Sequence, residues 1–103
     1  MYGLSEKTID LLHAYFENKL EIKEVQTFGS RAQGTEKPGS DIDFAIFTNT
    51  DQDLAGQVQV ELDELQTPYF FDVVDYTQIH HIPLKEHIDR FGKNFFYRKK
   101  NTL

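Results

Sequence analysis

The segment DIDFAIF, from Asp41 to Phe47, places two carboxylates in an otherwise apolar run. Its aromatic and branched residues predict a β-strand. Residues two apart on a strand point to the same face, with backbones about 6.6 Å apart, so Asp41 and Asp43 project side by side. Ile42 and Phe44 then face the core. Two carboxylates on one surface repel each other unless a cation neutralises them, and Mg²⁺ prefers oxygen ligands, so the pair indicates a metal site.

The pair alone does not separate a metal site from a solvated surface, because the chain has 17 acidic residues. Acidic pairs also occur at 51–53 and 61–63, where helix ends and solvated faces explain them. Asp72 interrupts a second apolar run, FFDVV. If that strand lies parallel to the first, Asp72 can complete a cluster of three carboxylates. An unpartnered aspartate in the core would be costly, so Asp72 either points outward or has a ligand.

Gly29 and Ser30 could bind an anion, whereas the aspartates would bind cations. They follow a short predicted strand at 23–28. A Gly-Ser step from a strand into a helical turn exposes backbone N–H groups and a hydroxyl, which together suit phosphate oxygens. An ordinary turn is the alternative explanation. A bending loop would also account for Gly34 and Gly39.

Amphipathic spacing predicts three helices around these strands. The first begins after Ser5, which can cap it. The second extends from Asp51 or Asp53 to about Leu65, and the third lies within PLKEHIDRFG at 83–92, ending at a glycine. The apolar residues at helical spacing are Ile9, Leu12, Phe16 and Leu20, then Leu54, Val58, Leu62 and Leu65, then Leu84, Ile88 and Phe91.

The strands are predicted at 23–28, 41–47 and 69–76, with a short edge strand in NFFYR at 94–98. One helical turn and a loop should join the first two strands, because that segment holds two glycines and a proline. A helix between the second and third strands is typical of a parallel crossover. We therefore expect an α/β (α+β) fold with a small mixed β-sheet of three to four strands flanked by helices. The length suits a single domain spanning 1–103.

Composition narrows the function classes. A net charge of -6 disfavours nonspecific binding of nucleic acid, because Lys and Arg supply most of that affinity. The chain has no cysteine, which excludes disulfides and thiolate metal sites and fits the cytoplasm. The N-terminus lacks a basic region followed by an apolar stretch, and no run approaches the roughly 18 apolar residues of a membrane span. We expect a cytoplasmic protein outside the membrane.

Other polar residues are better explained structurally. A turn before the proline at 83 explains the adjacent His80 and His81, whereas His13 and His87 fall in helices without metal-ligand company. Asp75 begins the turn after its strand, with an outward carboxylate as the alternative. In the tail, the aromatic residues Phe95, Phe96 and Tyr97 should lie in the core, and the charged residues Arg98, Lys99 and Lys100 should be solvated. If the aromatic residues are partly exposed, they would form a surface for a partner.

The motifs together resemble a known family. Phe28-Gly29-Ser30, ten intervening residues, Asp41-Ile42-Asp43-Phe44 and a later Asp72 are similar to the nucleotidyltransferase superfamily that includes DNA polymerase beta. The form GSRAQG…SDIDFAIF resembles the minimal nucleotidyltransferases, small prokaryotic proteins commonly paired with a HEPN-domain partner as antitoxin and toxin. Phe44 replaces the usual aliphatic residue, which we interpret as a packing variant. The resemblance implies a polymerase beta-like nucleotidyltransferase fold.

The resemblance also implies a role for each matching residue. Asp41 and Asp43 would bind two divalent ions, Mg²⁺ or Mn²⁺, and Asp72 would bind one ion and help to deprotonate the acceptor hydroxyl. Gly29 and Ser30 would hold the triphosphate. Arg31 could steady the phosphates, although a solvated arginine explains it equally well.

The implied reaction is in-line attack of a hydroxyl on the α-phosphorus of a nucleotide, with pyrophosphate leaving. Two metal ions about 3.5 to 4 Å apart would stabilise the attacking and departing oxygens. The family points to transfer of AMP from ATP to a tyrosine of a HEPN toxin, with the antitoxin in a hetero-oligomer. The alternative is a non-catalytic nucleotide-binding module that neutralises its partner by contact alone. Three carboxylates favour the enzyme, because contact alone needs no costly acidic cluster.

Overall fold

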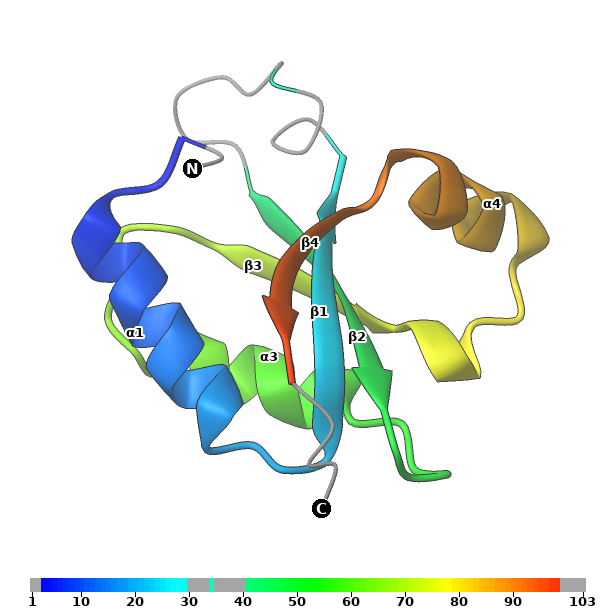
Figure 1. Ribbon diagram of the computed structural model, residues 1–103, viewed down its shortest axis with the longest axis horizontal. Helices are drawn as coiled ribbons and strands as arrows, with labels where there is room; N and C mark the ends of the chain where they lie inside the picture. Colours follow the sequence, from blue (N-terminus) through cyan, green and yellow to red (C-terminus); the bar gives the residue numbers. More distant parts are fainter. Residues whose placement is uncertain (1–2, 30–33, 35–40, 99–103) are drawn as a thin grey trace.

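The computed structural model describes residues 3–29, 34 and 41–98. Within these residues it has three α-helices, four β-strands and one 3₁₀ turn (Figure 1). The elements are α1 (Glu6–Glu17), β1 (Ile22–Phe28), β2 (Ile42–Thr48), α3 (Ala55–Asp63), β3 (Phe71–Asp75), η1 (Tyr76–Gln78), α4 (Ile82–Phe91) and β4 (Lys93–Tyr97). The predicted α+β class is confirmed. The helical turn predicted between the first two strands lies outside the described residues.

The four strands form one mixed sheet in the order β3-β2-β1-β4. β2 and β3 are parallel and are joined through α3, which confirms the predicted crossover. β1 is antiparallel to β2 and to β4, and β4 is the predicted edge strand. The register places Asp43 opposite Asp72 on one side and opposite Phe28 on the other. The ends of three strands therefore meet at Asp43.

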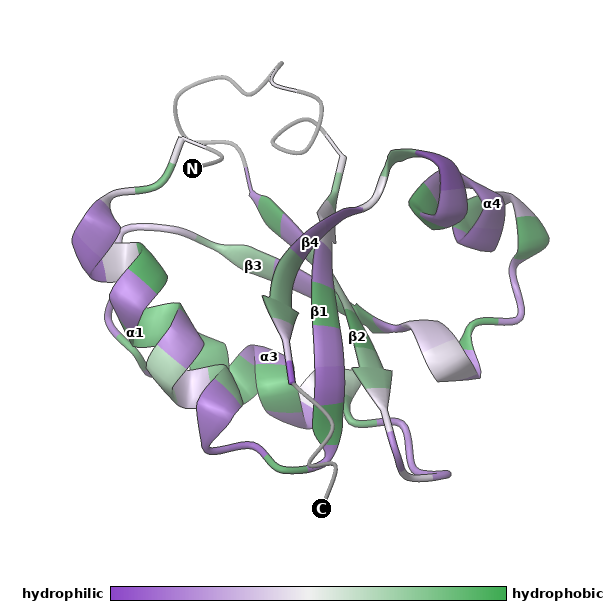
Figure 2. Ribbon diagram, viewed as in Figure 1, coloured by the Kyte–Doolittle hydropathy of each residue, from purple (hydrophilic) through white to green (hydrophobic). Residues whose placement is uncertain are grey.

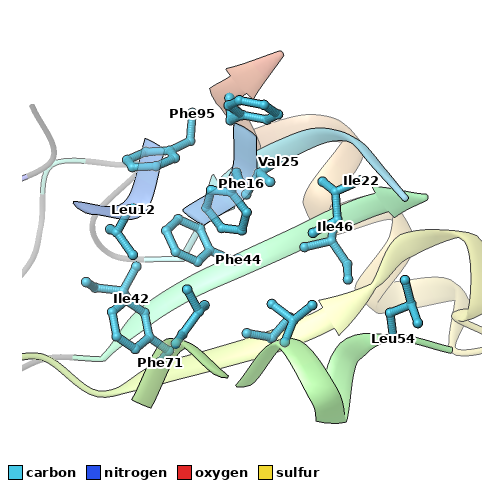
Figure 3. Close-up of a cluster of buried hydrophobic side chains, with 14 of the residues drawn as sticks. Leu12, Phe16, Ile22, Val25, Ile42, Phe44, Ile46, Leu54, Phe71 and Phe95 are labelled. Carbon is cyan, nitrogen blue, oxygen red and sulfur yellow. The ribbon is translucent and has the colours of Figure 1, made fainter. Parts of the chain in front are cut away.

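The main core lies between the sheet and the helices α1 and α3 (Figure 3). Leu12 and Phe16 of α1 point toward β2, where the Phe16 and Phe44 ring centroids are 5.6 Å apart. Val58 and Leu62 of α3 complete this layer and are fully buried. Because alternate strand residues face opposite sides, the apolar positions of β1 and β2 build this core while the positions between them face away. Figure 2 shows the resulting alternation along β1.

Among the described residues, the opposite face of the sheet is covered only in part, chiefly by α4 (Figure 1). Ile88 of α4 packs with Phe28 and Ala45 in a second, smaller cluster. Asp43 and Asp72 lie on this same face, one residue into β2 and β3 respectively. At this end of the sheet, Asp72 is exposed and Asp43 is half-buried.

The predicted helix signals are largely confirmed. Ser5 caps α1, its Oγ accepting a hydrogen bond from the Thr8 N–H at 3.2 Å. The placement of Leu20 on the apolar side of this helix was wrong, because α1 ends at Glu17 and Leu20 is 69% exposed. The chain turns there to enter β1. Among the described residues, no helix has both the length and the apolar character needed to cross a membrane.

Arg98 is part of the fold rather than a solvated charge, so that prediction was wrong. The last carbonyl groups of a helix lack partners within it and attract a cation, which explains the position of the guanidinium. Phe95 and Phe96 are buried as predicted, whereas Tyr97 is 62% exposed, so its prediction as a core residue was wrong. Lys99 and Lys100 lie outside the described residues. The guanidinium donates hydrogen bonds to the carbonyl oxygens of Phe16, Glu17, Lys19 and Ile22.

Candidate active site

The structure gathers the three predicted carboxylates at one end of the sheet. Asp43 and Asp72 are direct neighbours in the parallel register of β2 and β3. Asp41 immediately precedes β2 and is exposed, on the side of the chain that Asp43 also faces. Ile42 and Phe44 point the other way and are 1% and 0% exposed, as predicted. Asp72 is exposed, so its side chain points outward rather than into the core.

The carboxylates influence one another electrostatically. Partial burial raises the pKa of Asp43 above its ordinary value, and the negative charges of Asp72 and Asp41 raise that pKa further. The His87 imidazole acts in the opposite direction. The charged form of Asp43 is therefore disfavoured until a cation neutralises the cluster.

The donor set of this cluster suits a divalent cation. Carboxylate oxygens on two adjacent strands are the ligands that Mg²⁺ and Mn²⁺ prefer, and Mg²⁺ completes its shell with water and phosphate oxygens. Among the described residues, however, no three acidic or histidine side chains are already grouped closely enough to hold a metal ion. The three aspartates thus lie at the same end of the sheet without converging on one point. Among them, only Asp43 and Asp72 are paired in the strand register.

Gly29 lies beside the carboxylates, at the end of β1. It follows Phe28, the partner of Asp43 in the antiparallel register, and its φ of +79° favours glycine. A Cβ on Gly29 would clash with Oδ2 of Asp43, so a side chain there would force this carboxylate to move. The glycine therefore lets the backbone pass directly beside this carboxylate. Ser30 and Arg31 lie outside the described residues, so their phosphate-binding roles stay predictions.

Asp75 has a structural role. Its side chain is 3% exposed and faces the main core, opposite to Asp72. The carboxylate accepts hydrogen bonds from the N–H and hydroxyl of Thr77, at 3.1 and 2.7 Å, and from the Leu54 N–H at 3.3 Å. It therefore begins the turn η1, as predicted, and is not an additional outward carboxylate.

His87 was missed as a neighbour of the site. Its ring stands edge-on to Phe28, with ring centroids 6.2 Å apart, and Phe28 is the direct partner of Asp43. The sequence carried no signal for this approach, because His87 is 44 residues from Asp43 and reaches it only through the packing of α4 on the sheet. His80 and His81 lie in the segment between η1 and α4 rather than in the predicted turn, and His81 precedes α4 as its extended N-cap residue.

The geometry can be compared with known proteins. The family model described as "Polymerase beta, Nucleotidyltransferase" matches residues 10–101, which include every predicted site residue. The chain belongs to this nucleotidyltransferase family. No curated protein matches it.

Solved structures with the same nucleotidyltransferase fold include toxin–antitoxin complexes. A chain in the crystal structure of a toxin-antitoxin with AMP-PNP is 27% identical, with a TM-score of 0.64 over 93% of this chain and 76% of that chain. A chain of a mutant MntA-HpeT toxin-antitoxin is 28% identical, with a TM-score of 0.60 and coverages of 93% and 75%. A chain in the structure of a tri-AMPylated Shewanella oneidensis HEPN toxin in complex with MNT antitoxin is 23% identical. Its TM-score is 0.58, over 89% of this chain and 68% of that chain. This last likeness shows the fold alone.

Proposed function

We propose that residues 1–103 form one nucleotidyltransferase domain that transfers AMP from ATP to a tyrosine of a HEPN toxin and thereby acts as its antitoxin. The observation that carries the proposal is the register of Asp43 with Asp72 beside Gly29. Family membership supports nucleotidyl transfer. The similar toxin–antitoxin structure with AMP-PNP supports the nucleotide and the partner.

Each residue then has a chemical task. Asp41 and Asp43 would hold two ions, Mg²⁺ or Mn²⁺, and Asp72 would share one of them. When bound, these ions supply charge stabilisation for the attacking and leaving oxygens. The backbone at Gly29 would bind phosphate oxygens together with Ser30, and Arg31 would add positive charge. Asp72 accepts the proton of the acceptor hydroxyl.

The strand order fits an in-line displacement. Asp72, Asp43 and Gly29 belong to β3, β2 and the end of β1, which are successive in the sheet. The acceptor oxygen would approach at Asp72 and form its bond to the α-phosphorus near Asp43. The bond from that phosphorus to the bridging oxygen breaks, and pyrophosphate departs over the end of β1. The hydroxyl proton passes to Asp72, so charge and atoms balance.

A contact-only antitoxin is the second candidate. It is favoured by one observation, that the three aspartates do not converge within the described residues. Against it stands the cost of holding a half-buried Asp43 beside two other carboxylates, since burial first and then the charges of Asp72 and Asp41 raise the pKa of Asp43. Contact alone would not require this cost.

Asp72→Asn separates the two candidates. The variant should lose about 10²- to 10⁴-fold in transfer, because general-base assistance is typically worth that much. The assay mixes the protein with the HEPN partner, Mg²⁺ and labelled ATP, follows AMP on the partner by mass spectrometry, and scores toxin neutralisation in parallel. Asp63→Asn, an exposed change at the end of α3, is the matched control. Full neutralisation by an Asp72→Asn protein that transfers nothing would leave contact as the mechanism.

A further inference from the structure

His87 lies on α4 against the end of β1. Its ring and that of Phe28 meet at 77° in an edge-on contact. Phe28 pairs directly with Asp43 on the same face of the sheet and precedes Gly29. The imidazole thus lies near the point where the carboxylates and the glycine turn meet, and it acts to lower the pKa of Asp43.

The described residues contact the ring of His87 but not its nitrogens. The half-buried ring packs on Phe28 and on Phe91, whose centroid is 5.0 Å away, and both partners are apolar. Within the described part of the chain, neither nitrogen of His87 makes a hydrogen bond. A phenylalanine could make the same ring contacts, whereas an imidazole also offers an N–H donor to a ligand.

In the proposed reaction, the strand order indicates which part of the nucleotide would lie near His87. With the acceptor at Asp72 and the α-phosphorus near Asp43, an in-line departure directs the leaving group over β1. This is the side on which α4 packs. The β- and γ-phosphates would therefore lie between Gly29 and His87.

We propose that His87 is a nucleotide-contacting residue whose imidazole N–H donates a hydrogen bond to the pyrophosphate half of the nucleotide. The inference rests on the proposed function, since it adds a residue to the same site. A donor at this position also offsets negative charge where a triphosphate meets a carboxylate cluster. AMP, which lacks the β- and γ-phosphates, would not make this contact.

Two substitutions at His87 separate a ligand contact from a packing role. His87→Phe keeps a ring against Phe28 and Phe91 but removes both nitrogens, and His87→Gln keeps a hydrogen-bond donor without the ring. His81→Gln, an exposed change at the start of α4, is the matched control. Calorimetry with Mg²⁺ measures binding of ATP, pyrophosphate and AMP to each protein, and thermal melts report folding.

His87→Phe should melt like wild type and bind ATP and pyrophosphate roughly 10-fold more weakly, as expected for the loss of one hydrogen bond to a charged group. AMP binding should not change, and His87→Gln should retain part of the affinity. Unchanged ATP affinity in a folded His87→Phe, or an equal loss for AMP, overturns the inference and leaves the proposed function standing. Failure of the wild type to bind ATP or pyrophosphate overturns both.

A second measurement follows ligand binding in the wild-type protein itself and uses a variant only for assignment. The imidazole proton signals of His87 in the wild-type protein, assigned by their loss in His87→Gln, should shift when pyrophosphate and Mg²⁺ are added. The same signals should stay in place with AMP. Signals that do not respond to pyrophosphate while calorimetry shows that it binds would place the ligand away from His87 and overturn the inference.

Discussion

Asp43 is the residue at which the stability of the fold and the demands of the site conflict. Its partial burial and its acidic neighbours raise its pKa, so the folded protein holds this proton more tightly than the unfolded chain does. Stability from such a group is fully present below the unfolded pKa and is lost as pH rises through the higher folded pKa. At neutral pH without divalent ions, Asp43 therefore destabilises the folded state.

Removing this repulsion should stabilise the protein in the absence of metal. We expect Asp41→Asn combined with Asp43→Asn to melt at a higher temperature than wild type in EDTA at neutral pH. The advantage should shrink as pH falls through the range in which Asp43 gains its proton, and Mg²⁺ should stabilise wild type only. Thermal melts across pH measure this, with the exposed Asp10→Asn as control. An unfolded double variant would show that these carboxylates make structural hydrogen bonds.

Gly29 and Gly34 provide a matched pair for the phosphate turn. Both have positive φ, +79° and +73°, so alanine at either position costs about 1 to 2 kcal/mol in backbone strain. Only at Gly29 would the new Cβ meet the Asp43 carboxylate, since no atom of the described residues lies within 4 Å at Gly34. Gly29→Ala should therefore weaken Mg²⁺-dependent ATP binding about 10-fold or more.

Gly34→Ala should lose only stability. Calorimetry with Mg²⁺ and then with EDTA measures both changes, and EDTA should abolish ATP binding by the wild type because the acidic cluster then repels the triphosphate. Equal ATP affinities for the two alanine variants would remove the argument that the backbone at Gly29 approaches the ligand beside Asp43.

At the scale of elements, α1 and α3 are joined by a polar bridge outside the core. The Tyr15 hydroxyl donates to Oε1 of Glu61 at 2.6 Å, and Lys19 Nζ lies 3.1 Å from the same oxygen. The hydrogen bond from Tyr15 is the main cause that lowers the pKa of Glu61, while burial and then Glu61 raise the pKa of Tyr15. The bridge sets the two helices against each other on the face opposite to the carboxylates.

Tyr15→Phe should lower the free energy of unfolding by about 0.5 to 1.5 kcal/mol, the usual contribution of one hydrogen bond. Because the pKa of Glu61 is lowered in the folded state, this contribution is present above its unfolded pKa and is lost as pH falls through the folded pKa. The variant should therefore differ from wild type less at acid pH. Denaturant titrations would show it, with Tyr97→Phe, 62% exposed, as control. Equal stabilities of the two variants would contradict the bridge.

On the scale of the whole molecule, the contacts of Arg98 and the candidate site lie at opposite ends of β1. Arg98, at the end of β4, donates to the Phe16 carbonyl at 2.8 Å across 82 positions of sequence, and to the Ile22 carbonyl at the start of β1. The carboxylates lie at the opposite end of β1, beside Phe28. The anchoring contacts and the candidate site are therefore separated by the length of a strand.

Arg98→Gln should consequently affect stability and not binding. We expect a loss of about 2 kcal/mol, since hydrogen bonds to charged groups contribute about 1.5 to 3 kcal/mol. Arg98→Lys should recover only part of the loss, because an ammonium cannot reproduce the planar guanidinium. ATP affinity of the folded protein should be unchanged, and Arg90→Gln on the exposed side of α4 is the control. A weakened ATP affinity in Arg98→Gln would show that the two ends are coupled.

Part of the candidate site was predictable because it depends on neighbours in the sequence. The alternation of a strand is enough to place Asp41 and Asp43 on one side and Ile42 on the other, and a glycine after a strand is enough to predict the turn at Gly29. The helix cap at Ser5 is equally local. Such features follow from backbone geometry over a few residues.

Only the tertiary structure decided what distant segments bring together. The register of Asp43 with Asp72 depends on how α3 packs between the two strands, because a shift by one residue would turn Asp72 toward the core. His87 and Arg98 were assigned from their local surroundings, and both assignments missed contacts made across the fold. The sequence alone thus determined which residues can do chemistry at one strand end. Their partners followed from long-range packing, which no local spacing encodes.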